Sequence, residues 1–150
     1  MRAILQRVSG AQVSVSEVTI SRIGAGFLIL LGVEEDDTQE DVSWLVGKIS
    51  KMRVFDDTGG KMNLALQQIS GEALVVSQFT LHASTRKGNR PSFIKAAQPA
   101  HAKPLYEKFC DSLSSEIAKP VRRGEFGAMM QVSLTNDGPV TILIDSRNRE

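Results

Sequence analysis

The sequence predicts a mixed α+β fold: a single compact domain with a curved, mixed β-sheet, barrel-like at its core, and two main helices. Two observations lead to this class. The chain has 150 residues, 41% of them hydrophobic and 23% charged, and no repeat, low-complexity tract or linker divides it. Its apolar patterns follow the order strands, helix, strand, helix, strands, which is typical of an α+β domain.

Apolar alternation predicts the first strands. Residues 3–8 form one strand, residues 13–15 alternate apolar and polar side chains, and residues 18–23 return as a second strand. Residues 24–26, with the sequence Gly-Ala-Gly, form a turn. Residues 27–33 are a continuous apolar run, as expected for a central strand that is buried on both faces.

A helix is predicted after this strand. Asp36, Asp37 and Thr38 offer side-chain oxygens to free backbone amides, and acids favour the positive end of the helix dipole. Apolar residues then recur at helical spacing, namely Val42, Leu45, Val46, Ile49 and Met52. Residues 57–60 form a loop after this helix.

A strand, a second helix and two further strands are predicted in the second half. Residues 73–81 are predicted as a strand, and a second helix begins at Pro99 or Pro104 and ends before Pro120. Its apolar stripe consists of Leu105, Phe109, Leu113 and Ile117. Residues 128–135 and 140–144 are the last two strands. The Asn-Asp-Gly-Pro sequence between them, taken alone, favours a hairpin turn.

Charge is unevenly distributed, although the net charge is only +1. Residues 73–106 contain no acid but contain Arg86, Lys87, Arg90, Lys95 and Lys103. Such a block in a nearly neutral protein indicates a local anionic partner, for example a nucleic-acid end, rather than wrapping along a duplex. A solvated loop with an excess of charge is the alternative interpretation.

Composition also limits the compartment. No apolar run is long enough to span a bilayer, so no membrane partner is expected, and the N-terminal residues do not resemble a signal peptide. The single cysteine, Cys110, excludes an intrachain disulfide and fits a reducing compartment. We therefore expect a cytoplasmic protein.

Familiar catalytic motifs are missing from the sequence. There is no Gly-x-Ser-x-Gly, no Gly-Lys-Ser/Thr phosphate loop, no Cys-x-x-Cys and no His-Glu-x-x-His. The two histidines, His82 and His101, are better explained by packing or surface positions than as ligands. Cys110 lies in a helical apolar stripe, which favours the core over a nucleophile. We expect neither a metal nor a cofactor.

Two short motifs remain. Ser77-Gln78-Phe79-Thr80-Leu81 ends one apolar run, and Asn136-Asp137-Gly138-Pro139-Val140-Thr141 lies between two others. Each places polar groups and unusual backbone where a strand ends, which is a common place for a binding site. An X-Pro bond reaches cis at far lower cost than other peptide bonds, and such bonds typically lie in tight turns, so Pro139 permits a cis bond here. Two carbonyls would then face the same way, as acceptors for a ligand's amino group.

Together these motifs closely resemble those of D-aminoacyl-tRNA deacylases, chiral-proofreading esterases that remove a D-amino acid from tRNA. The resemblance covers residues 1–146 as one deacylase domain, and residues 147–150 form a polar C-terminal tail outside it. It includes Leu5-Gln6-Arg7-Val8, Leu31-Gly32-Val33, Lys61-Met62-Asn63-Leu64, Lys87-Gly88-Asn89-Arg90-Pro91-Ser92-Phe93 and Phe126-Gly127-Ala128.

The resemblance implies a homodimer with active sites at the subunit interface. Gly138 and Pro139 would form a cis peptide that enters the partner's site, where their carbonyls hold the ammonium group of the D-amino acid and an L side chain would clash. Asn136 belongs to the same substrate-binding segment. The catalytic wall around the ester would consist of Ser77, Gln78, Phe79 and Thr80.

The chemistry implied by the resemblance leaves the role of Thr80 open. Backbone amides, the Gln78 side chain or the Thr80 hydroxyl would stabilise the oxyanion; alternatively, Thr80 orients water. The 2′-hydroxyl of the terminal adenosine would assist. Glycine lacks the clashing group, so glycyl-tRNA is also an expected substrate.

The expected partner is the aminoacylated end of tRNA, and no DNA partner is expected. Arg86, Lys87 and Arg90 would meet its phosphates or terminal adenosine. Phe93 packs near the adenosine or in the core. Other hypotheses are a non-catalytic tRNA-end-binding module, a stand-alone relative of the editing domain of threonyl-tRNA synthetases, and a purely structural dimer.

Overall fold

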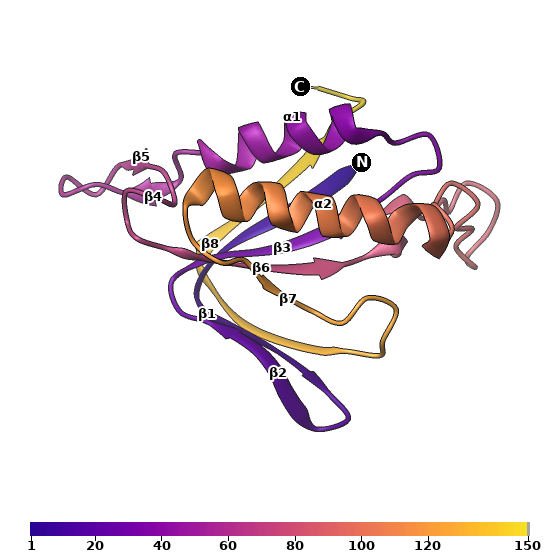
Figure 1. Ribbon diagram of the computed structural model, residues 1–150, viewed down its shortest axis with the longest axis horizontal. Coiled ribbons are helices and arrows are strands. Elements are labelled where there is room, and N and C mark those ends of the chain that lie inside the picture. Colours follow the sequence, from indigo (N-terminus) through magenta and orange to yellow (C-terminus); the bar gives the residue numbers. More distant parts are fainter. Residues whose placement is uncertain (150) are drawn as a thin grey trace.

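Strands from both halves of the chain curl into one sheet, and the two α-helices pack against the same face of it (Figure 1). The computed structural model describes residues 1–149, so Glu150, the last residue of the predicted tail, lies outside the described residues. None of the described helices is long and apolar enough to cross a membrane. The elements are β1 (Arg2–Val15), β2 (Val18–Ile23), β3 (Gly26–Gly32), α1 (Gln39–Ser50), β4 (Phe55–Asp56), β5 (Met62–Leu64), β6 (Glu72–Ser77), the 3-10 helix η1 (Phe79–His82), α2 (Pro99–Ile117), β7 (Arg122–Arg123) and β8 (Gln131–Asp145).

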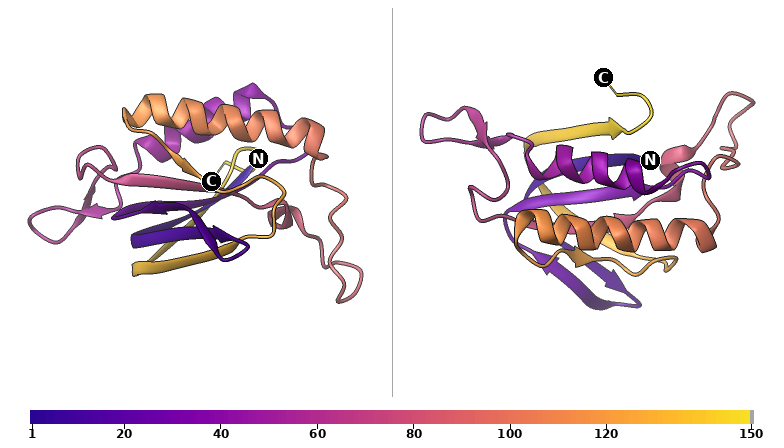
Figure 2. Two further views of the ribbon diagram at one scale, coloured as in Figure 1. Left: turned by 60° about the horizontal axis from the view of Figure 1, so that its bottom comes forward. Right: turned by 45° about the horizontal axis from the view of Figure 1, so that its top comes forward.

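The large sheet is mixed and nearly closed. Its strand order is β2-β1-β3-β6-β7, and β8 also pairs with β1. β6 runs parallel to β3 and β7 runs parallel to β6, whereas β1 is antiparallel to its three partners. The Ser21 hydroxyl on β2 donates a hydrogen bond to the Arg123 carbonyl on β7, which joins the two ends of this order. The predicted α+β class with a curved, barrel-like sheet is confirmed (Figure 2).

Alternate residues of the central strands face two different cores. Phe27, Ile29 and Leu31 of β3 pack in the larger core with both helices, whereas Leu28 packs with Leu74 on the opposite face. This two-sided burial explains why residues 27–33 are apolar without interruption. The helices contribute Val42, Leu45, Val46, Ile49, Tyr106, Phe109, Cys110, Leu113 and Ile117 to the larger core.

Both helices begin where the sequence predicts. Thr38 is the N-cap of α1, and Asp41 accepts a 2.9 Å hydrogen bond from the Thr38 amide, which completes a capping box. Of the two expected starts of α2, Pro99 is correct, and Pro104 lies inside the helix. Proline is tolerated at a helix start because the amide it lacks would have no partner within the helix.

The predicted strand over residues 73–81 is wrong at its carboxyl end. β6 stops at Ser77 because its neighbour β3 ends at Gly32, and the Gln78 amide then donates a 2.8 Å bond to the Leu31 carbonyl. A Cβ atom on Gly32 would lie 2.8 Å from the Gln78 carbonyl oxygen. The chain therefore turns closely past this glycine and enters η1.

Residues 128–135 and 140–144 are not two strands joined by a hairpin. They belong largely to one strand, β8, which is antiparallel to β1 along nearly its whole length. The register shifts near Val8 show that the second motif is an irregularity inside this strand. The hairpin alternative is therefore wrong: the Asn-Asp-Gly-Pro sequence marks a local distortion and not a chain reversal.

Several strand boundaries also differ from those expected. β1 is continuous over Arg2–Val15, and the small antiparallel pair of β4 and β5 flanks the predicted loop at residues 57–60. β7 has only two residues. Segments this short contain too few side chains for a periodic pattern to identify them.

Candidate active site

A pocket of about 680 Å³ opens at the carboxyl end of β6, within the usual size range of small-molecule sites. Ser77, Gln78 and Phe79 of the first motif line it, as do Pro99, Ala102 and Tyr106 from α2. Much of the remaining lining is apolar and includes Phe93, Phe126, Met129 and Met130. The first three residues of this motif therefore form part of the pocket wall. Thr80, the next residue of the motif, lies in η1 with an exposed side chain.

The side chains of the first motif interact with each other. Gln78 Nε2 donates a hydrogen bond to Thr80 Oγ1. A hydroxyl has one proton and two lone pairs, so this bond leaves the Thr80 proton available for another acceptor. The first amides of a helix also have no partner within it. The start of η1 is thus a place where hydrogen-bond donors gather beside the pocket.

The basic loop connects to this wall through two aromatic rings. Phe79 and Phe93 meet edge to face with their centroids 5.1 Å apart. Reciprocal backbone hydrogen bonds between Ser84 and Ser92, of 2.8 and 2.9 Å, close the base of the loop. The structure thereby brings Arg86, Lys87 and Arg90 onto one exposed loop next to the pocket. Phe93 lines the pocket and is 36% exposed, so of its two expected positions the core is excluded.

The second motif is held by an arginine that the sequence interpretation did not single out. The Gly138–Pro139 peptide bond is cis, as predicted, and both residues are exposed. Arg7 Nε donates a 3.0 Å hydrogen bond to the Asp137 carbonyl, and its Nη1 donates a 2.7 Å bond to the Val54 carbonyl. Arg7 is only 8% exposed, so it anchors the segment from the protein interior.

A signal for Arg7 is present in the sequence. Alternation along β1 places it on the same side as Ala3 and Leu5, which are both fully buried. A charged side chain at such a position needs buried partners. We read this stretch only as part of a family resemblance and so missed the role of Arg7.

Asn136, which we expected to bind substrate, uses its side chain inside the motif. Its Oδ1 accepts a 3.1 Å hydrogen bond from the Val140 amide, and its Nδ2 donates a 2.8 Å bond to Thr141 Oγ1. Both bonds close the segment around Gly138 and Pro139. The geometry thus gives Asn136 a part in shaping this segment.

The two motifs do not meet within one chain. The strand register places the second motif beside Arg7, which pairs with Phe27, whereas Ser77 pairs with Leu31. Four residues along a strand span roughly 13 Å, and the three strand spacings from β8 to β6 span about 14 Å. If both motifs contribute to one site, the second must come from another copy of the chain.

Neither histidine points to a catalytic base. His82, the last residue of η1, is 1% exposed, with no hydrogen bond to its ring nitrogens among the described residues and the Glu34 carboxylate 3.5 Å from Nδ1. His101 is half-buried, and its Nε2 lies 2.9 Å from the Asp37 carbonyl oxygen. Neither side chain lines the pocket.

Cys110 is completely buried on α2, and burial raises the pKa of its thiol to about 12. The thiol therefore stays protonated at neutral pH. Replacing Cys110 with Ala is expected to lower the free energy of unfolding by roughly 1 kcal/mol, because the smaller side chain leaves a cavity. The ester hydrolysis that the resemblance implies should remain at the wild-type rate in a folded sample. A folded variant that has lost the chemical step would instead identify Cys110 as a nucleophile.

Comparison with known proteins places the chain in a family. The model of the D-Tyr-tRNA(Tyr) deacylase family matches residues 4–145. A D-aminoacyl-tRNA deacylase from Akkermansia muciniphila is 61% identical, and one from Porphyromonas gingivalis is 60% identical, each over 100% of both chains. This chain belongs to the D-Tyr-tRNA(Tyr) deacylase family. The resemblance inferred from the two motifs is confirmed.

Solved structures agree with this deacylase family fold. One described as "c-Myc DNA Unwinding Element Binding Protein" is 41% identical and matches with a TM-score of 0.92 over 97% of this chain and 98% of that chain. Another, described as "Structural Analysis of a probable eukaryotic D-amino acid tRNA deacylase", has a TM-score of 0.81 at 19% identity, over 95% of this chain and 97% of that chain. At that identity the likeness concerns the fold alone.

Proposed function

We propose that this protein hydrolyses the ester bond of D-aminoacyl-tRNA and releases the free D-amino acid and tRNA. The observation that supports this most is the family match over residues 4–145 of a chain in which Ser77, Gln78 and Phe79 of the first motif line a pocket. We expect the reaction to take place in the cytoplasm. Glycyl-tRNA is a further proposed substrate, because glycine has no side chain to exclude.

The proposed chemistry is attack of water on the ester carbonyl. The pocket lining contains no Asp, Glu, His or Cys among the described residues, so stabilisation of charge is the main contribution we assign to the protein. Backbone amides at the start of η1 and the side-chain amide of Gln78 are the candidate donors to the oxyanion. Because Gln78 already donates to Thr80, the Thr80 proton is available either to the oxyanion or to the attacking water. The 2′-hydroxyl of the terminal adenosine would assist.

Chiral selection requires a second subunit in this proposal. Gly138 and Pro139 of one subunit would enter the pocket of the other, where their carbonyls accept hydrogen bonds from the substrate ammonium. An L-amino acid bound by the same ammonium would direct its side chain into this backbone. Large exposed apolar side chains beside the pocket, Phe79, Ile94 and Met129, support a partner surface there, since such groups rarely gather on a free surface.

The basic loop is proposed to hold the tRNA end. Replacing Arg86, Lys87 and Arg90 together with Ala should weaken tRNA binding and flatten the dependence of log K on log salt by roughly one unit for each lost phosphate contact. Binding is measured by filter retention between 50 and 200 mM salt, roughly the range where such contacts weaken markedly.

A matched control removes the same amount of positive charge from other parts of the surface. Lys51, Lys61 and Lys108 are also exposed, and their replacement by Ala should leave the salt slope as it is in the wild type. An unchanged slope in the loop variant would return Arg86, Lys87 and Arg90 to the solvated-loop interpretation.

Duplex DNA added as competitor tests the prediction of no DNA partner: it should displace tRNA poorly.

Loss of ester from D-tyrosyl-tRNA, followed with purified protein, tests the proposed function. A deacylase releases tyrosine with multiple turnovers. A non-catalytic tRNA-end-binding module would bind the same substrate and leave the ester intact. A relative of the threonyl-tRNA synthetase editing domain would hydrolyse an L-aminoacyl ester in preference to D-tyrosyl-tRNA.

A further inference from the structure

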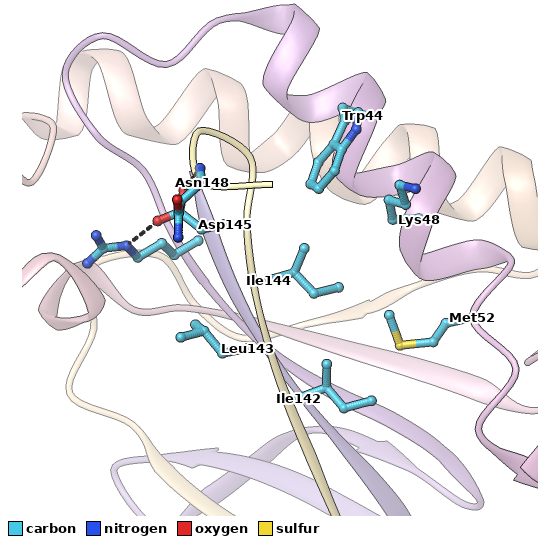
Figure 3. Close-up of a pocket in the computed structure, with 9 residues that line it drawn as sticks. Trp44, Lys48, Met52, Ile142, Leu143, Ile144, Asp145 and Asn148 are labelled. Carbon is cyan, nitrogen blue, oxygen red and sulfur yellow. Dashed lines mark hydrogen bonds and ion pairs between the residues drawn. The ribbon is translucent and has the colours of Figure 1, made fainter. Parts of the chain in front are cut away.

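Arg2 and Asp145, which lie outside the pocket, connect η1 to the end of β8. Arg2 Nη1 donates a 2.9 Å hydrogen bond to the Leu81 carbonyl in η1, and Arg2 Nε donates a 2.8 Å bond to Asp145 Oδ2 at the end of β8. Figure 3 shows the second bond as the dashed line that reaches Asp145, in a groove of about 550 Å³ between β8 and α1. The guanidinium of Arg2 thus connects the last strand of the sheet to the turn that carries Thr80.

The hydrogen bonds within the turn itself are few. η1 is four residues long, and its N-cap residue Gln78 makes no side-chain capping bond. The backbone bonds of the turn are the 3.3 Å contact from the Leu81 amide to the Gln78 carbonyl and the 3.1 Å contact from the Ala83 amide to the Thr80 carbonyl. Hydrogen bonds in a 3-10 turn have poorer geometry than those of an α-helix. The charge-assisted bond from Arg2 to the Leu81 carbonyl therefore adds a strong restraint on the orientation of this turn, beside the Phe79–Phe93 contact and the burial of His82.

Asp145 fixes the direction in which Arg2 donates. Its Oδ1 accepts hydrogen bonds from the amides of Arg147 at 2.9 Å and Asn148 at 3.4 Å, so its own position is set by the chain that follows β8. Burial alone would raise the pKa of Asp145, but the hydrogen bonds from Arg2 and from these two amides outweigh it and lower the pKa. The carboxylate is ionised at neutral pH.

The shape of the guanidinium matters here as much as its charge. A planar group with Nε on the Asp145 carboxylate points Nη1 in a fixed direction, toward Leu81. A lysine ammonium keeps the charge but lacks this planar arrangement of donors, so it cannot bind both partners in this geometry. The side chains of Arg2 and Asp145 are 33% and 17% exposed, which shields the pair in part from water.

We infer that Arg2 and Asp145 are a positioning pair that sets the orientation of η1, and through it the Gln78–Thr80 part of the proposed ester site. The inference rests on the proposed function. Neither residue lines the pocket, so the pair acts through the Leu81 carbonyl and not by touching substrate.

Single-turnover hydrolysis of D-tyrosyl-tRNA by Arg2→Lys and Asp145→Asn tests this role. The rate constant is expected to fall roughly tenfold in each, and the protein concentration at half-saturation to change less than about twofold, because tRNA binding is assigned to the basic loop. Asp111→Asn is the matched control: it removes the carboxylate partner of Arg123 in another Arg–Asp pair, and its rate constant should match the wild type.

Two further measurements separate positioning from general stability. The double variant should be no slower than the slower single variant, because both substitutions break the same bridge. The amide resonances of Thr80 and Leu81 should shift in both single variants and stay in place in Asp111→Asn. If Arg2→Lys fails to fold, the rate constant and the amide resonances of Asp145→Asn alone decide whether the pair positions the turn.

Wild-type rate constants in folded Arg2→Lys and Asp145→Asn would overturn the inference. So would unchanged Thr80 and Leu81 resonances. An inactive wild-type protein would contradict the proposed function instead, and the resonances would then still decide whether the pair positions the turn.

Discussion

Replacing Gly138 with Ala is expected to lower kcat/KM for D-tyrosyl-tRNA by roughly a hundredfold, or about 2.7 kcal/mol of transition-state free energy. The backbone at Gly138 has φ +129°, a conformation that L side chains rarely adopt. A Cβ atom there would lie 2.9 Å from Val140 Cγ2 and 3.2 Å from Arg7 Nη2. The segment and its anchor would therefore both shift, and in the proposed complex the methyl group would also obstruct the substrate.

Gly60→Ala is the matched control for this substitution. Gly60 also has positive φ, +74°, but a Cβ atom on it would meet nothing within 4 Å. Both variants introduce backbone strain, so activity retained in Gly60→Ala and lost in Gly138→Ala would assign the effect to the second motif. Wild-type kcat/KM in folded Gly138→Ala would contradict its role.

The same variant tests whether the site is shared between subunits. Gly138→Ala subunits are mixed and refolded with subunits that carry Gln78→Ala and Thr80→Val. In a two-fold symmetric dimer, random mixing should restore about a quarter of the wild-type activity, because half of the dimers would have one of their two sites intact. No recovery, although mixed dimers form, would place both motifs in the same subunit or deny them a common site.

Arg7→Ala is expected to affect both stability and activity. Arg7 is nearly buried, and its removal leaves the carbonyls of Val54 and Asp137 without their charged donor. Losses of this kind lower the free energy of unfolding by roughly 2–4 kcal/mol, measured by denaturant titration. Because the Gly138–Pro139 segment also loses its anchor, the rate of D-tyrosyl-tRNA hydrolysis should fall about tenfold or more in the fraction that remains folded.

Arg22→Ala serves as the comparison for Arg7→Ala. Arg22 is an exposed arginine on the neighbouring strand β2, and its guanidinium donates to the side chain of Gln12. Its loss should change the free energy of unfolding by less than about 0.5 kcal/mol and leave activity unchanged. Equal effects of the two substitutions would remove any special role for Arg7.

Sequence patterns predicted the parts of the fold in which many residues repeat one signal. The unbroken apolar run at residues 27–33 predicted a doubly buried strand, and Thr38 before a stripe at helical spacing predicted the start of α1. The end of β6 was not predictable in this way. It depends on where its neighbour β3 ends and on the close approach at Gly32, which are contacts between distant segments.

The second motif was missed as a strand for a related reason. Asn, Asp, Gly and Pro carry the same turn signal whether a chain reverses or only bulges, and pairing with the long strand β1 decides between them. The residue types of the candidate site were recognisable from resemblance. The residues that support the site were not, since Arg2 and Arg7 donate to carbonyls far away in sequence and Asp145 binds the guanidinium of Arg2.

Paired rates on D- and L-tyrosyl-tRNA test the central claim most directly. Both esters are prepared on the same tRNA and incubated with the same concentration of wild-type protein, and the remaining ester is counted over time. The proposed site predicts that the D ester is hydrolysed and that the L ester decays at the rate seen without protein. Equal rates on the two enantiomers would contradict chiral selection by the Gly138–Pro139 backbone.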